Sequence, residues 1–140
     1  MTLKEIFDTV EKHLLKQNEQ ALQPDEMGFD NNCKYQTESG LKCAVGCLIK
    51  AEHYNFHLEG VTINEVKALI QANEDQEEPE KSGEMEAATA LHTALRKSGV
   101  PMDKETMDML LALQDIHDKS EPHLWRSELK FLAHALFPKN

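Results

Sequence analysis

Residues 2–14, TLKEIFDTVEKHL, carry the pattern that decides the fold. Thr2 and Glu5 have the T-x-x-E spacing of a capping box, which begins a helix. The apolar residues of this stretch recur every three or four positions and form one stripe: Leu3, Ile6, Phe7, Val10 and Leu14. We therefore predict a helix that opens at Thr2 and fades over Gln20–Gln23, ahead of Pro24.

The same helical pattern continues through the rest of the chain. Thr62 and Glu65 repeat the capping box. Three more helices are predicted, over residues 84–98, over residues 103–118, and from Pro122 to just before Pro138, with Trp125 on the inner face of the last. The sequence therefore predicts a mainly α fold of five or six helices in a small bundle, forming a single domain over residues 1–140.

One stretch, residues 33–43, has a β pattern. Apolar and polar side chains alternate on both sides of Glu38-Ser39-Gly40. A three-residue loop with Gly40 in the left-handed conformation predicts a short β-hairpin in which Gln36 faces Lys42. The apolar run 44–49 predicts a short buried helix, where Gly46 permits a close backbone approach.

Composition and charge exclude several classes of function. The chain has 140 residues, 40% of them hydrophobic, and a formal net charge of −10. This charge disfavours direct nucleic-acid binding and attachment to an anionic membrane surface. No apolar run reaches the length of a membrane span, and residues 1–10 lack the pattern of a signal peptide. We therefore expect a soluble, cytoplasmic protein.

Two segments are candidate partner-binding surfaces. Residues 74–84 belong to an acidic, Pro- and Gly-containing stretch that we expect to be mobile, and it could imitate a phosphate backbone. Its candidate contact residues are Glu74, Asp75, Glu77, Glu78 and Glu80. The loop that follows the predicted short helix holds the other candidates, His53, Tyr54, Phe56 and His57. A solvated acidic loop and aromatic side chains that plug the core are the alternative interpretations.

Three cysteines and a histidine make a candidate zinc site. Cys43 and Cys47 are four residues apart, Cys33 falls on the same side of the predicted hairpin, and either His53 or His57 could complete a tetrahedral set. The spacing departs from the usual two close ligand pairs, so buried cysteines that pack as small apolar residues are the favoured interpretation. No other cofactor is predicted.

Catalytic patterns are weak. His117-Asp118 with His92 suggests a metal-dependent hydrolase, but the downstream aspartate that such a site needs is missing. Phosphate-binding glycine loops and a nucleophile elbow are absent from the sequence. The chain has only two arginines, Arg96 and Arg126, so a nucleotide pocket would need lysines, backbone N–H groups or the second copy in a homodimer. A role without catalysis is favoured.

Three segments carry a resemblance: CKY at 33–35, GLKCAVGCLI at 40–49, and LQDIHD at 113–118 followed by Trp125. They resemble a family of small, uncharacterised tailed-phage and prophage proteins, in which the position of Cys47 is often not cysteine. The resemblance implies an accessory protein of the host cytoplasm that binds and inhibits a host protein, such as a defence component. The alternatives are a sponge that sequesters a signalling nucleotide, and the metal-dependent hydrolase.

Overall fold

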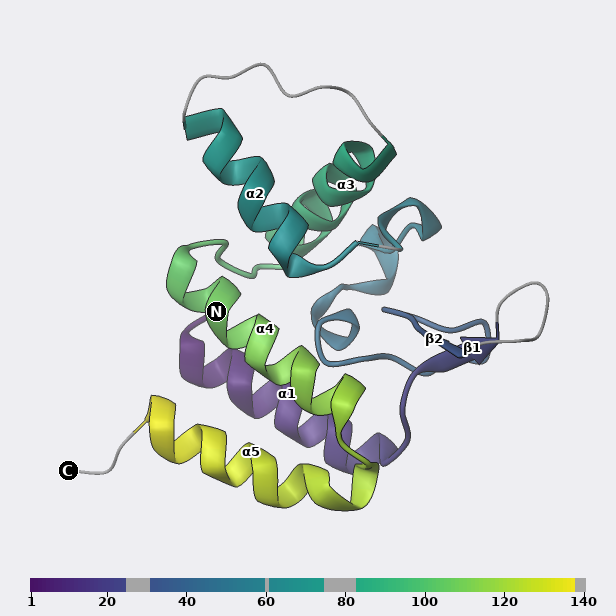
Figure 1. The fold of residues 1–140 in the computed structure, drawn as a ribbon, viewed down its shortest axis with the longest axis vertical. Helices are drawn as coiled ribbons and strands as arrows, with labels where there is room; N and C mark the ends of the chain where they lie inside the picture. The colour runs from purple at the N-terminus through teal and green to yellow at the C-terminus, as the bar shows by residue number, and fades with distance from the viewer. Residues whose placement is uncertain (25–30, 60, 75–82, 138–140) are drawn as a thin grey trace. The chain divides into compact units, whose positions relative to one another are not determined.

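The computed structural model describes residues 1–24, 31–59, 61–74 and 83–137 (Figure 1). These residues are mainly helical, as predicted. They form five α-helices: α1 (Leu3–Gln17), α2 (Ile63–Glu74), α3 (Gly83–Lys97), α4 (Lys104–Lys119) and α5 (Pro122–Leu136). In the described part of the chain, every helix is too short or too polar to cross a bilayer.

Local capping residues set the helix ends. The Thr2 hydroxyl accepts from the Glu5 N–H and the Glu5 carboxylate accepts from the Thr2 N–H, each at 3.1 Å, so the predicted capping box is present. The first helix ends at Gln17 because Asn18 takes the left-handed conformation (φ 49°) and donates to the Leu14 carbonyl. It is therefore shorter than predicted: a left-handed cap ends it before the proline does.

The two-stranded sheet lies elsewhere than predicted. Strand β1 (Leu22–Pro24) pairs antiparallel with β2 (Asn31–Cys33), and Leu22 faces Cys33. The predicted hairpin over 33–43 is not confirmed, because Cys33, at the start of its first arm, pairs with Leu22 instead. What remains of it is one isolated bridge, between Gln36 and Lys42, at a reversal where Gly40 has a φ of 95°.

The chain divides into two compact units. Unit 1 is Met1–Leu48 with Ala112–Asn140, and unit 2 is Ile49–Leu111. The chain leaves unit 1, forms unit 2 and returns along α4, whose residues belong to both. The single domain over residues 1–140 stays a prediction.

In unit 1, α1 packs against α5 and against a 3-10 turn, Gly46–Leu48, within the predicted short helix. To the core of unit 1, α1 contributes its buried stripe and α5 contributes Trp125 and Leu129, both 0% exposed. The turn approaches Tyr35 closely: a Cβ added to Gly46 would lie 1.8 Å from the Tyr35 carbonyl oxygen. Gly46 therefore allows a backbone contact that any other residue would block.

In unit 2, α3 packs against α2 and against a 3-10 turn, Phe56–Leu58. The core consists of apolar residues from all three elements and their connections: Leu58, Val61, Ile63, Val66, Leu91 and Leu95. The end of α3 is closed by Gly99, whose φ is 92°, and by the Val100 N–H, which donates to the Leu95 carbonyl. This cap fixes the path of the chain after α3.

Candidate functional site

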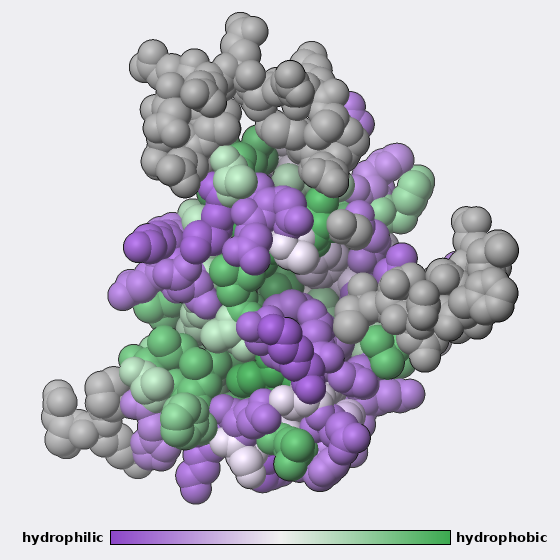
Figure 2. Space-filling view, viewed as in Figure 1, coloured by the Kyte–Doolittle hydropathy of each residue, from purple (hydrophilic) through white to green (hydrophobic). Residues whose placement is uncertain are grey.

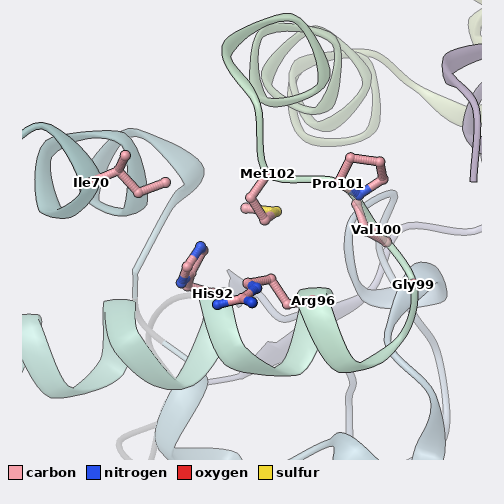
Figure 3. Close-up of a pocket in the computed structure, with 7 residues that line it drawn as sticks. All are labelled: Ile70, His92, Arg96, Gly99, Val100, Pro101 and Met102. Atoms are coloured by element: carbon pink, nitrogen blue, oxygen red, sulfur yellow. The ribbon is translucent and has the colours of Figure 1, made fainter. Parts of the chain in front are cut away.

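A pocket of about 730 Å³ opens in unit 2 beside the last two turns of α3 (Figure 3). Among the described residues, its walls come from α2, α3 and the connection after α3: Ile70, His92, Arg96, Gly99, Val100, Pro101 and Met102. His92 and Arg96 extend from α3 side by side, Ile70 reaches in from α2, and Met102 lies above them (Figure 3). The pocket thus combines two side chains that can form hydrogen bonds, His92 and Arg96, with apolar ones.

The local sequence explains this arrangement. His92 and Arg96 are four residues apart, so they lie on the same face of α3. Val100 is buried with 2% exposure and anchors the connection, so that Pro101 and Met102 turn back over the helix. The pocket is therefore built by the helix cap at Gly99 as much as by the helix itself.

The electrostatics of the pocket are positive. Burial, and then the neighbouring charge of Arg96, lower the pKa of His92. A lowered pKa leaves the ring mainly neutral at pH 7, able to donate one hydrogen bond and accept another. Arg96 is exposed, and no carboxylate of the described residues forms an ion pair with it. Within the described residues, the guanidinium is therefore open to an anionic ligand.

The predicted partner loop separates into inward and outward residues. The half-buried Tyr54 donates its hydroxyl to Glu59 Oε2 at 2.7 Å, and burial and this neighbour raise its pKa. His53 is half-buried at the end of a 3-10 turn, Ala51–His53. Phe56 is 72% exposed, and its ring centroid lies 4.1 Å from that of His57. Of the four predicted contact residues in this loop, only Phe56 and His57 are exposed.

The acidic candidates fall largely outside the described residues. Glu74 is the last residue of α2 and therefore helical, within the predicted mobile segment. Asp75, Glu77, Glu78 and Glu80 lie outside the described residues. Phosphate mimicry by this segment stays a prediction.

The two cysteines whose side chains are described, Cys43 and Cys47, make local contacts in unit 1. The Cys43 thiol is 1% exposed and accepts from the Gly46 N–H at 3.2 Å, and the Cys47 thiol donates to the Ala44 carbonyl at 3.1 Å. Burial raises the pKa of both thiols, that of Cys47 to about 12. In the metal-free protein both thiols are therefore protonated. His53 belongs to unit 2, the Cys33 side chain is not among those described, and no group of three metal-ligating side chains occurs among the described residues.

His117 is engaged in the core of unit 1. The ring is 0% exposed, its Nε2 accepts from the Ala21 N–H at 3.0 Å, and its Nδ1 lies 2.7 Å from Asp118 Oδ1. Because Nε2 accepts, Nδ1 carries the proton and donates to Asp118. The ring also stacks on Trp125, with the centroids 5.5 Å apart. Both ring nitrogens are thus occupied, which leaves no lone pair for a catalytic metal.

A second hollow, of about 420 Å³, lies between α4 and α5 in unit 1. Its described lining is apolar with acidic members: Ala112, Asp115, Ile116, Ser127, Glu128, Phe131 and Leu132. Phe131 is 79% exposed, and Leu124 and Leu136 on the same helix are 44% and 40% exposed. Figure 2 shows apolar surface over the end of α5.

The sequence did not single out Arg96, Ile70, Met102 or Phe131 as site residues. The four-residue spacing of His92 and Arg96 could have placed them together, whereas the approach of Ile70 and Met102 depends on tertiary packing. Comparisons with protein-family models, curated proteins and solved structures return no match. The resemblance to tailed-phage proteins therefore stays an expectation.

Proposed function

We propose that unit 2 binds a small organic anion and performs no chemistry on it. The observation that carries the proposal is the pocket of Figure 3, where Arg96 and His92 stand beside Ile70 and Met102. A binding site of this kind combines apolar walls with a few polar groups that orient the ligand. This develops the alternative of a sponge for a signalling nucleotide.

Each wall of the pocket has a role in this proposal. The Arg96 guanidinium donates two parallel hydrogen bonds to a phosphate or carboxylate, the geometry for which arginine is suited. His92 donates one more, and its low pKa keeps the free pocket from carrying a second charge. The apolar part of the ligand, such as a nucleobase, packs against Ile70 and Met102. Among the described lining residues, His92 alone can exchange a proton near neutral pH, which supports binding over catalysis.

Two matched arginine variants test the proposal. Adenosine monophosphate is titrated by calorimetry into wild type, Arg96→Gln and Arg126→Gln in magnesium-free buffer. The chain has only these two arginines, and Arg126 is exposed on α5 in unit 1. We expect Arg96→Gln to lose about tenfold or more in affinity and Arg126→Gln to match wild type. No binding by wild type, or equal losses in both variants, would overturn the proposal.

A second candidate function is the one that the resemblance implies. We propose that unit 1 docks a host protein, such as a defence component, on the exposed apolar residues of α5 in the host cytoplasm. Phe131, 79% exposed beside an apolar hollow with Asp115 and Glu128, supports this. Exposed aromatic side chains mark interaction sites, and the acidic members favour a basic partner.

The docking proposal is tested by co-purification from host lysate with wild type, Phe131→Ser and Lys130→Ser. We expect one stoichiometric protein to be retained by wild type and by Lys130→Ser and lost with Phe131→Ser. Lys130 is the exposed neighbour of Phe131 on α5 and serves as the matched control. Retention of the same protein by Phe131→Ser would contradict docking at this face.

A further inference from the structure

Arg96 borders two hollows in unit 2. Besides the larger pocket that it shares with His92, a smaller one of about 270 Å³ is lined, among the described residues, by Thr93, Arg96 and Lys97. Residues 92 and 96 form one row along α3, and residues 93 and 97 form the neighbouring row. Arg96 is the residue common to both hollows.

The chemistry of the smaller hollow matches that of an anion site. Lys97 supplies a second positive charge, Thr93 supplies a hydroxyl donor, and both are exposed. The guanidinium carries five N–H donors in one plane, so it can donate to one anionic group in each hollow. Among the described residues no carboxylate is paired with Lys97 or lines either hollow.

Two effects oppose anion binding here: the partial negative charge of the helix C-terminus and the acidic net charge of the chain. A helix C-terminus carries about −0.5 of a charge, against two full positive charges from Arg96 and Lys97. Carbonyls near the end of α3 are already engaged: the Ser98 N–H donates to those of Ala94 and Leu95, the Gly99 N–H to that of Arg96, and the Val100 N–H to that of Leu95. The acidic net charge of −10 is the second opposing effect, and physiological salt screens charges that lie farther from the site than the Debye length of about 8 Å.

We propose that the site takes a small molecule with two phosphoryl groups, one held between His92 and Arg96 and the other between Arg96, Lys97 and Thr93. This inference rests on the proposed anion-binding function of unit 2 and narrows its ligand class to organic diphosphates. Phosphoryl groups fit better than carboxyl groups because each carries three acceptor oxygens and up to two charges, enough for the donors of both hollows.

The test compares ligands that differ by one phosphate. Adenosine monophosphate, adenosine diphosphate, pyrophosphate and succinate are titrated by calorimetry in magnesium-free buffer. The proteins are wild type, Lys97→Gln, Thr93→Val and, as a matched loss of charge in unit 1, Lys12→Gln. All three substituted side chains are exposed, and the melting temperature of each variant checks that it is folded.

We expect the diphosphate to bind wild type about tenfold more tightly than the monophosphate, because it adds a charge-assisted contact. Lys97→Gln should remove most of this gain, Thr93→Val part of it, and Lys12→Gln none. Pyrophosphate should bind more tightly than succinate.

The failures of the two proposals are distinguishable. Equal affinity of wild type for both nucleotides would overturn the diphosphate inference and leave the anion-binding proposal standing. So would a diphosphate gain that Lys97→Gln retains, or succinate binding as tight as pyrophosphate. If wild type bound none of these ligands, both proposals would fail.

Discussion

Gly46 lies against the backbone of Tyr35, where a Cβ would come within 1.8 Å of the carbonyl oxygen. Gly46→Ala must therefore move one of two backbone segments in the core of unit 1. We expect it to lower the free energy of unfolding by about 3 kcal/mol, measured by urea denaturation followed by circular dichroism.

Gly40→Ala is the matched control for this prediction. Gly40 has a φ of 95° and nothing within 4 Å of an added Cβ, so the substitution costs only backbone strain, about 1–2 kcal/mol. A loss at Gly46 no larger than that at Gly40 would show that the 3-10 turn moves freely away from Tyr35.

His92 should couple anion binding to pH. Burial and then Arg96 lower its pKa in the free protein, and a bound anion favours the protonated ring and raises that pKa. Proton uptake therefore accompanies binding, and affinity should rise as pH falls from 8 through the pKa of the bound state. The measurement is the Kd of adenosine monophosphate against pH for wild type and His92→Gln.

The ligand's own titration is common to both proteins, so the difference between the two pH profiles isolates the histidine. Parallel profiles would mean that His92 does not contact the anion. Such a result would leave Arg96 as the group that holds it.

At the scale of single elements, α5 depends on Trp125. The ring is 0% exposed, stacks on His117 and donates from Nε1 to the Ser120 carbonyl at 3.0 Å. Trp125→Ala should reduce the free energy of unfolding by about 3–5 kcal/mol, and Trp125→Phe by less, because phenylalanine keeps part of the volume. Circular dichroism in urea measures both, and an unchanged midpoint for Trp125→Ala would contradict the burial of this ring.

Features that depend on short-range sequence patterns were predicted well. The capping box at Thr2 and the reversal at Gly40 depend on residues within a few positions of one another, and the structure has both. The sheet was misplaced because its partners are chosen over a longer distance. Cys33 could pair with a strand that follows it or with one that precedes it in the sequence. The structure pairs it with Leu22, which precedes it.

The candidate site was half predictable for the same reason. His92 and Arg96 share a face of α3 by spacing alone. Ile70 and Met102 come to them from α2 and from the connection after α3, which only tertiary packing decides. On α5, Trp125 is buried as predicted from the sequence, whereas Leu136 at the end of the helix is 40% exposed.

At the scale of the whole molecule, two charge effects govern stability in acid. The net charge of −10 at pH 7 falls toward zero near the pI of about 5.1, which relieves repulsion and favours folding. Against this, a carboxylate at the start of each of three helices, α1, α2 and α4, accepts hydrogen bonds. Hydrogen bonds from the N–H and the hydroxyl of Thr2 lower the pKa of Glu5. Hydrogen bonds from the hydroxyl and the N–H of Thr62 lower the pKa of Glu65, and the same two groups of Thr106 lower the pKa of Asp103.

A lowered pKa in the folded state adds stability that is fully present above the unfolded pKa and is lost as pH falls through the folded one. The melting temperature should therefore hold or rise slightly from pH 7 to about 5, then fall below about pH 4.5, the ordinary pKa of glutamate. The triple variant Glu5→Ala, Glu65→Ala, Asp103→Ala should melt lower at pH 7 and show a flatter profile below pH 4.5. Profiles of equal slope would mean that other carboxylates, and not these helix starts, set the acid limit of the fold.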